Sequence, residues 1–141
     1  MKKLDELINK YPKAFESDWY GFECKDGWYD IIEPVIKAIN EHNSSMTNPQ
    51  EREIYPEQVK EKFGTLRFYT NYVTTEIDKL VNEAEDKSAT TCEQCGKKGE
   101  LICARWLYTA CPEHMKEGDR TYAKFMELRE YDLTLKLETS K

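Results

Sequence analysis

The chain has 141 residues, which is enough for one domain with its own core and too few for two domains of ordinary size. Hydrophobic residues make up 39% of it and aromatic residues 12%, which excludes the weakly hydrophobic composition of a disordered protein. With 21 basic and 27 acidic residues the formal net charge is −6, so the chain repels nucleic-acid phosphates unless its cations gather on one face.

The N-terminal residues, MKKLDELINKY, carry neither the apolar segment nor the small-residue cleavage site of a secretory signal. No apolar run approaches the roughly 18 residues of a membrane span. The five cysteines are an odd number and include a CxxC pair, which favours reduced, metal-binding thiols over disulfides. We therefore expect a cytoplasmic protein with no membrane partner.

Two helices are predicted in the first 40 residues. Residues 4–11 place apolar side chains at the spacing of an amphipathic helix, and Pro12 is positioned to end it. A wide apolar face then begins at Trp28 and predicts a second helix that runs to about Asn40, with Pro34 in its first turn.

Polar and β-forming segments follow these helices. Residues 41–53, EHNSSMTNPQERE, are rich in turn formers and predict a surface loop with a solvated His42. Residues 54–72 are dense in β-branched and aromatic side chains around Gly64. They predict either two short strands or one strand bent at a glycine bulge.

A third helix is expected from about Thr75 to Lys87. Its apolar residues repeat the helical spacing, and Thr74 or Thr75 followed by acidic residues supplies an N-terminal signal. The cysteine-rich segment that begins at residue 91 follows this helix.

Two equally spaced pairs of metal-binding residues dominate that segment. Cys92 and Cys95 are separated by two residues, and after fifteen further residues Cys111 and His114 repeat the spacing. Such pairs are typical of the two knuckles of a tetrahedral zinc site. The residues between the pairs predict a strand or hairpin, so residues 91–115 are expected to form a zinc ribbon.

Three thiolates and one imidazole favour Zn²⁺, and ferrous iron in the same ligand set stays open. All four ligands come from the protein, which leaves no position for water or substrate and predicts a structural ion. Cys24 and Cys103 are expected to be packed thiols, with Cys103 as the substitute ligand if His114 does not bind.

The C-terminal residues 116–141 leave two alternatives open. Tyr122, Phe125 and Met126 favour a helix, whereas DLTLKLE, residues 132–138, alternates as a strand does. Together the elements predict an α+β fold, a small sheet with flanking helices and a C-terminal zinc-ribbon module. Residues 1–90 are expected to pack on the ribbon, so that the chain forms one compact domain.

The sequence carries no signature of catalysis. No GxGxxG, GxxxxGK[ST], GxSxG or HExxH motif occurs, and the acidic runs are typical of solvated faces. One histidine is assigned to the metal and the other lies in the predicted loop. We therefore expect no enzymatic activity.

Two aromatic segments contain candidate contact residues. Tryptophan, tyrosine and arginine are enriched at interface hot spots. The candidate partner-binding residues are Trp19, Tyr20, Trp28, Tyr29, Arg67 and Tyr69. The cations and aromatic rings of residues 60–72 also fit a base-stacking surface, although a core strand with a charged face is favoured.

The ordered segments DGWYDII, VKEKFGTLRFY, EAEDKSATTCEQCGKKGEL and CPEH resemble a family of small uncharacterised phage and prophage proteins. In that family a helix, a "KEKFG.LRFY" strand and a C-terminal CxxC…CxxH zinc module recur. The resemblance covers residues 20–115 and carries no catalytic residue.

This resemblance implies a phage-encoded accessory protein that binds a host protein in the host cytoplasm. It favours an inhibitor or modulator, with anti-CRISPR or other anti-defence activity as a specific form. The resulting prediction is a non-catalytic zinc-binding protein that acts through protein–protein interaction. The alternative is a nucleic-acid-binding zinc ribbon.

Overall fold

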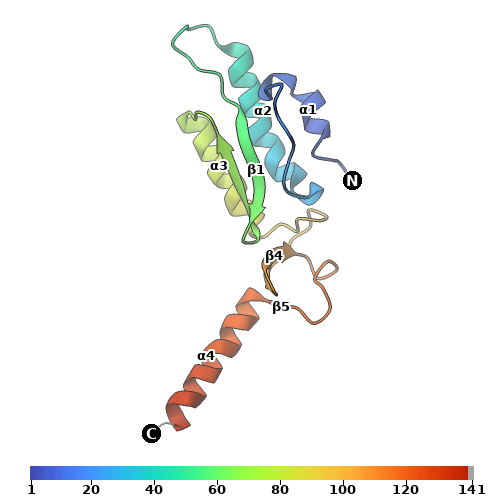
Figure 1. Cartoon of the computed structure of the whole chain (residues 1–141), viewed down its shortest axis with the longest axis vertical. Helices are drawn as coiled ribbons and strands as arrows, with labels where there is room; N and C mark the ends of the chain where they lie inside the picture. Colours follow the sequence, from blue (N-terminus) through green and yellow to red (C-terminus); the bar gives the residue numbers. More distant parts are fainter. Residues whose placement is uncertain (140–141) are drawn as a thin grey trace.

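Residues 1–139 are described by a computed structural model, which is mixed α+β as the sequence predicts. The N-terminal part packs helices around a two-stranded antiparallel sheet of β1, Pro56–Lys62, and β2, Thr65–Thr70. The C-terminal part holds a three-stranded antiparallel sheet of order β4–β3–β5, formed by β3, Glu100–Cys103, β4, Leu107–Ala110, and β5, Arg120–Thr121. Figure 1 shows the two parts stacked along the long axis, with the last helix extending away from the rest. Each part has its own cluster of buried residues.

Both predicted N-terminal helices are present, and each begins close to its predicted position. Helix α1, Glu6–Lys10, ends before Pro12, which starts a 3-10 turn. Helix α2, Tyr29–Ser45, follows a 3-10 turn at Asp26–Trp28, so Pro34 lies in the second turn and not, as predicted, in the first. Proline removes one backbone N–H donor from the helix there, and burial of the apolar face stabilises the helix against that loss. The buried residues of that face are Tyr29, Ile32, Val35, Ile36 and Ile39.

Helix α2 continues to Ser45 instead of ending near Asn40, so the predicted loop is wrong for residues 41–45. Asn43 explains the extension. Its Oδ1 accepts a hydrogen bond from the Ile54 N–H at 2.9 Å, and its Nδ2 donates to the carbonyls of Ile54 and Lys13, both at 2.8 Å. His42 is half-buried, with Nε2 2.8 Å from the Arg52 carbonyl, and is therefore only partly solvated.

Asn43→Ala is expected to lower the free energy of unfolding by about 2 kcal/mol, because three backbone groups lose their partner. Urea unfolding measures this loss. Asn82→Ala, at an exposed position on the third helix, is the matched control and should change stability by less than about 0.5 kcal/mol. Equal effects of the two substitutions would contradict the role of Asn43.

Strands β1, Pro56–Lys62, and β2, Thr65–Thr70, form a hairpin, which confirms the first of the two predicted alternatives. Phe63 and Gly64 make its two-residue turn, with φ angles of 54° and 86°. Two positive φ angles are the signature of a type I′ turn, whose twist suits a hairpin. Val59, Leu66 and Phe68 point into the core.

Both outer edges of this hairpin are covered. Helix α3, Thr75–Ser88, capped by Thr74 as predicted, lies along β2. From it Ser88 Oγ accepts the Leu66 N–H at 2.9 Å, and Glu85 Oε2 accepts the Phe68 N–H at 3.0 Å. Along β1, the Glu23 N–H donates to the Val59 carbonyl and the Glu61 N–H to the Glu23 carbonyl. Side chains and loop backbone thus replace further strands at both edges.

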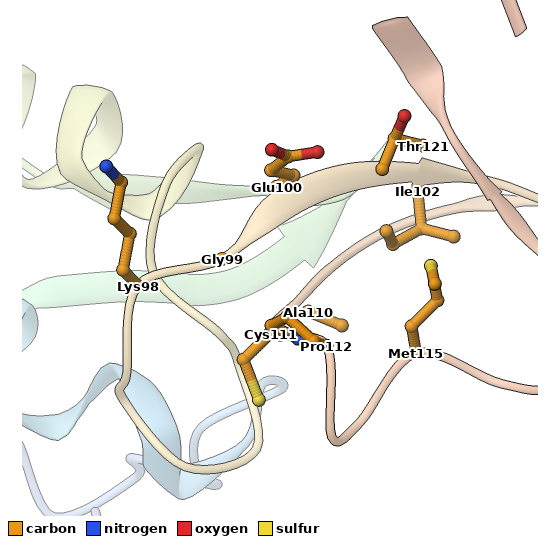
Figure 2. Close-up of a pocket in the computed structure, with 9 residues that line it drawn as sticks. All are labelled: Lys98, Gly99, Glu100, Ile102, Ala110, Cys111, Pro112, Met115 and Thr121. Carbon is orange, nitrogen blue, oxygen red and sulfur yellow. The ribbon is translucent and has the colours of Figure 1, made fainter. Parts of the chain in front are cut away.

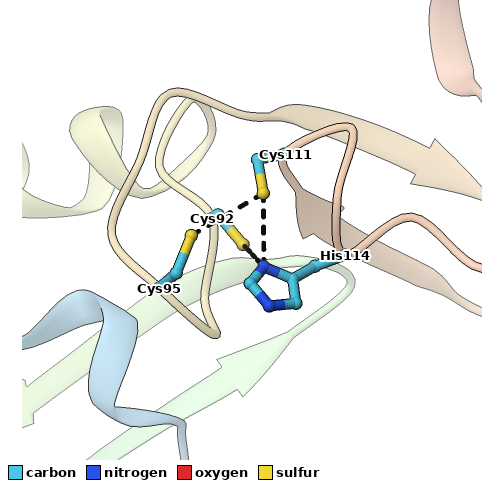
Figure 3. Close-up of side chains that lie close together, drawn as sticks. All are labelled: Cys92, Cys95, Cys111 and His114. Carbon is cyan, nitrogen blue, oxygen red and sulfur yellow. Dashed lines mark hydrogen bonds between the residues drawn. The ribbon is translucent and has the colours of Figure 1, made fainter. Parts of the chain in front are cut away.

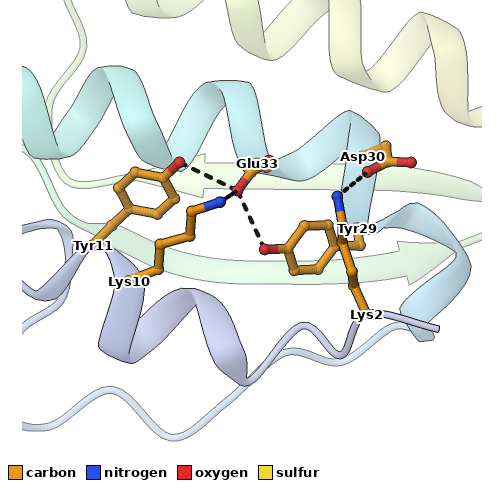
Figure 4. Close-up of polar contacts among 6 residues, drawn as sticks. All are labelled: Lys2, Lys10, Tyr11, Tyr29, Asp30 and Glu33. Carbon is orange, nitrogen blue, oxygen red and sulfur yellow. Dashed lines mark hydrogen bonds and ion pairs between the residues drawn. The ribbon is translucent and has the colours of Figure 1, made fainter.

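Glu33 on α2 is hydrogen-bonded to three side chains. Its Oε2 accepts from Lys10 Nζ at 2.7 Å and from the Tyr11 and Tyr29 hydroxyls, both at 3.2 Å (Figure 4). The hydrogen bond from Lys10 lowers the pKa of Glu33 most, against the opposing effect of burial, and the tyrosine hydroxyls lower it further. The ionised carboxylate therefore ties the region of α1 to α2.

The lowered pKa of Glu33 predicts an acid-dependent contribution to stability. This contribution is present above the ordinary carboxyl pKa of 4.5 and is lost as the pH falls through the folded-state pKa. Glu33→Gln is expected to cost about 1 kcal/mol at neutral pH and to flatten the decline of stability in acid. Urea unfolding from about pH 6 to about pH 3 measures both effects. Asp30→Asn, which removes an exposed ion pair with Lys2, is the control, and an equal pH dependence in both variants would contradict the prediction.

The aromatic residues of the segment before α2 do not form one exposed surface. Trp28 is fully buried and Tyr29 is only 4% exposed, so neither can contact a partner in this structure. This corrects the prediction for these two positions. Their rings pack in the hydrophobic core, and the Trp28 indole N–H donates to the Thr91 carbonyl at 2.9 Å.

Hydrogen bonds join the ribbon to the N-terminal part. The Gly27 N–H donates to the Glu93 carbonyl at 2.7 Å, and Thr109 Oγ1 donates to the Gly64 carbonyl at 2.6 Å. A Cβ at Gly27 would collide with the backbone of Cys92 and Glu93. Glycine is required here because the two backbones approach closely.

The C-terminal segment is helical. After the short strand β5, Arg120–Thr121, helix α4 spans Tyr122–Thr139, so the strand alternative for residues 132–138 is wrong. Helix α4 packs against β3 and β5 near its start and then extends away from the ribbon (Figure 1). None of the helices within residues 1–139 combines the length and apolar character of a membrane span.

Candidate metal centre

The first knuckle is a tight turn that directs two thiols to one side. The Cys92 N–H donates to the Lys97 carbonyl at 2.8 Å, and the Gly96 N–H donates to the Cys92 carbonyl at 2.9 Å. Gly96 has a φ of 81°, a left-handed conformation that glycine adopts without strain. The CxxCG sequence therefore folds locally into the turn that its spacing predicts.

The second knuckle follows the hairpin of β3, Glu100–Cys103, and β4, Leu107–Ala110. Cys111 comes directly after β4, and its carbonyl accepts hydrogen bonds from the N–H groups of His114 and Met115 at 3.1 and 3.0 Å. This turn brings the His114 ring beside the Cys111 thiol. The hairpin between the knuckles confirms the predicted strand or hairpin.

The two knuckles converge on one point (Figure 3). The ligand atoms of Cys92, Cys95, Cys111 and His114 all lie within 4.8 Å of one another. His114 Nδ1 is 3.2 Å from Cys111 Sγ and 3.6 Å from Cys92 Sγ, and Cys95 Sγ is 3.6 Å from Cys111 Sγ. A zinc tetrahedron with ordinary bond lengths has S···S and S···N edges of about 3.8 and 3.5 Å. The group thus has the size and donor chemistry to hold one metal ion.

The thiols need a cation if they are to ionise together. Burial raises the pKa of the Cys92 thiol, but backbone N–H groups of Cys111, Cys95 and Gln94 outweigh it and lower that pKa to about 7. At Cys95 the Lys97 N–H lowers the thiol pKa, and burial together with the neighbouring thiols raises it overall. Several thiolates this close repel one another without a central positive charge.

The other candidate ligands lie outside the cluster. Cys103 is on β3 and does not join the four converging side chains, so His114 needs no substitute. Cys24 is half-buried in the N-terminal part, where burial and nearby carboxylates raise its thiol pKa to about 12. Cys24 packs against the N-terminal core as predicted, and Cys103 is half-buried.

The ribbon has little apolar core of its own. Its fully buried cluster consists of Cys92, Ile102, Ala110 and Cys111, so two of its members are candidate ligands. Beside Cys111 is a mostly apolar groove of about 270 Å³, with Ile102 and Met115 on its wall (Figure 2). So small a core cannot offset the entropy of ordering the segment, and a metal ion would supply the missing free energy.

The remaining candidate contact residues lie on two elements. Trp19 is half-buried and packs against Phe15 and Phe22, with ring centroids 5.3 and 5.2 Å away, and the neighbouring Tyr20 is 72% exposed. Arg67 and Tyr69 share the outward face of β2, where Tyr69 is 46% exposed.

Sequence reasoning missed Trp106. This residue lies at the tip of the β3–β4 hairpin and is 66% exposed. The sequence does contain a signal for its exposure. Trp106 lies between the two knuckles, where the chain must reverse direction to bring them together.

Comparisons with profiles of protein families, with curated proteins and with solved structures found no significant match. The fold and the site therefore define the chain as an α+β protein with a closed Cys3His cluster able to hold a metal ion.

Proposed function

We propose that this chain is a non-catalytic zinc protein that acts by binding another protein. The Cys3His cluster is the observation that carries the zinc half of the proposal. Three soft thiols and an imidazole at tetrahedral spacing favour Zn²⁺ over Mg²⁺ or Ca²⁺. Four protein donors fill the coordination sphere, so the ion would brace the ribbon and leave no position for a reacting water.

Surface chemistry supports the protein-binding half. A bound Zn²⁺ with three thiolates moves the formal net charge from −6 to about −7, which disfavours a phosphate backbone. Large aromatic side chains remain exposed, among them Tyr20 and Trp106. Exposed tryptophan and tyrosine are typical anchors of protein interfaces.

The resemblance of residues 20–115 to small phage and prophage proteins supports a more specific role. We assign the chain, within this proposal, to phage-encoded inhibitors or modulators of a host protein, acting in the host cytoplasm. Anti-CRISPR or another anti-defence activity is the form that this role would take.

Affinity capture from bacterial lysate tests this role. The tagged, zinc-loaded chain is immobilised, the lysate is treated with nuclease, and bound proteins are identified by mass spectrometry. A stoichiometric host protein that survives nuclease and is absent from a Cys92→Ser control supports the proposal. Recovery that disappears with the nucleic acid contradicts it.

A nucleic-acid-binding ribbon is the second candidate. Phe63 is 65% exposed at the hairpin turn, with Lys62 Nζ 5.6 Å from its ring centroid, a pairing that also suits base stacking. This candidate predicts direct binding of oligonucleotides with an affinity that falls steeply as salt rises. A chain that acts by binding a protein should show no such salt-dependent affinity for oligonucleotides.

A further inference from the structure

A polar cleft of about 420 Å³ lies where the ribbon meets the N-terminal part. The N-terminal part contributes Glu23, Cys24 and Glu61 to its wall, and the ribbon contributes Glu93 and Trp106. The cleft is separate from the metal cluster, since none of the four converging side chains lines it.

Trp106 provides an aromatic wall. It lies in the turn between β3 and β4, and two thirds of its surface is exposed. An indole that is neither packed in the core nor paired with another ring offers its face to a ligand. Flat, weakly hydrated cations bind such faces.

Three carboxylates in the cleft lack a cation. Within residues 1–134, whose side chains the structure describes, no lysine or arginine lies within ion-pair distance of Glu23, Glu61 or Glu93. Glu61 Oε2 is buried and has no hydrogen-bond partner among the described residues. A buried carboxylate oxygen without a partner is costly, so a donor that reached it would be bound favourably.

The other carboxylates are only partly satisfied. Glu93 is 9% exposed, and its Oε2 accepts the Lys25 N–H at 3.0 Å. Glu23 Oε1 accepts two long contacts of 3.3 Å, from the hydroxyl of Tyr20 and the amide of Gln58. Glu23 and Glu93 therefore keep free acceptor capacity for a further donor.

The lysines that line the cleft are not ion-paired with these carboxylates among the described side chains. These lysines are Lys25 and Lys116. The raised pKa of Cys24, which burial dominates and to which Glu93, Asp26, Glu23 and Glu61 add, is consistent with a negative potential there.

We propose that this cleft binds an arginine side chain of a partner protein, with the guanidinium stacked on Trp106 and donating to Glu61 and Glu23. Arginine fits better than lysine because its planar group stacks on an indole and donates to two carboxylates at once. This inference rests on the proposed function, because it takes the partner to be a protein.

NMR titration of the full zinc-loaded chain tests the cleft directly. The probe is the capped tripeptide acetyl-Gly-Arg-Gly-amide, and the matched peptides carry lysine or citrulline instead of arginine. The arginine peptide should shift the Trp106 indole signal saturably, with the Trp28 signal as an internal reference for a buried ring. Citrulline, which keeps the shape and loses the charge, should not bind.

Variants locate the interaction. Trp106→Ala and Glu61→Gln should each weaken binding of the arginine peptide at least fivefold. Because Trp106→Ala has no indole signal at this position, its affinity is measured on the amide signals of the ribbon. Glu57→Gln, an exposed carboxylate on β1, is the control and should leave the affinity unchanged. Unfolding curves of each variant establish that the fold is retained.

Several results would overturn the arginine site. Equal shifts with arginine and citrulline peptides, or unchanged affinity in Glu61→Gln, contradict it. So does an oligonucleotide that shifts Trp106 when the arginine peptide does not. If a captured host protein binds Trp106→Ala and Glu61→Gln as well as the unmodified chain, this inference fails while the proposed function stands.

Discussion

Cys111→Ser is expected to abolish stoichiometric metal retention and to unfold the ribbon. Cys111 contributes a buried sulfur that lies within hydrogen-bond distance of His114 Nδ1 and near Cys95 Sγ, so its loss opens the ligand set. Binding of a structural Zn²⁺ supplies about 10 kcal/mol or more of apparent free energy in small zinc modules. Little apolar core remains to compensate, because Cys111 itself belongs to the ribbon's buried cluster.

Metal analysis and amide NMR measure these effects separately. Cys103→Ser is the matched control, since it removes a thiol from the same hairpin but not from the cluster. It should retain one metal ion and the dispersed signals of residues 91–121. A Cys111→Ser protein with full metal content and an intact ribbon would refute the assignment of this ligand.

Trp28→Ala is expected to destabilise the N-terminal part by about 3–5 kcal/mol, the usual cost of removing a fully buried aromatic side chain. The substitution also leaves the Thr91 carbonyl without the indole N–H that lies 2.9 Å away. Because Thr91 directly precedes the first knuckle, the contact between the two parts should loosen as well.

Urea unfolding gives the stability change, and amide shifts of the ribbon report the loosening. Trp28→Phe keeps part of the ring volume but loses the donor, so it should fall between the alanine variant and the unmodified chain. Trp106→Ala, at an exposed tryptophan, should cost less than about 0.5 kcal/mol. A Trp28→Ala protein as stable as Trp106→Ala would contradict the buried position of the ring.

Local patterns predicted the elements that local physics determines. The spacing of Cys92, Cys95, Cys111 and His114 was sufficient to predict that they converge, because a CxxC or CxxH turn directs both of its side chains to one side. The third helix was also predicted well, since its threonine cap and apolar spacing are adjacent in sequence. The convergence of the two knuckles required only a reversing hairpin between them.

Errors arose where distant residues decide the outcome. The extension of α2 depends on Asn43, whose partners include the backbone of Ile54, and no local pattern shows that pairing. The alternation in residues 132–138 left a strand and a helix open, and the structure is helical there. No glycine or proline interrupts the chain after Tyr122, so helix propagation through that alternation is uninterrupted.

The sequence pattern also could not predict which aromatic residues are buried. Trp28 and Tyr29 carry the same side chains that mark interfaces, and only the position of the 3-10 turn and of α2 shows that they face the core. Trp106 is the reverse case, because the hairpin places it at a tip where no other element packs over it.

A single Zn²⁺ in the Cys3His cluster is expected to fold the ribbon, and metal analysis combined with chelation measures this dependence. We predict one zinc ion per purified chain, loss of ribbon amide dispersion when a chelator removes it, and recovery when Zn²⁺ is restored, while the N-terminal part stays folded. A chain that contains no stoichiometric zinc, or whose ribbon signals survive complete removal of the metal, would show that zinc does not fold the ribbon.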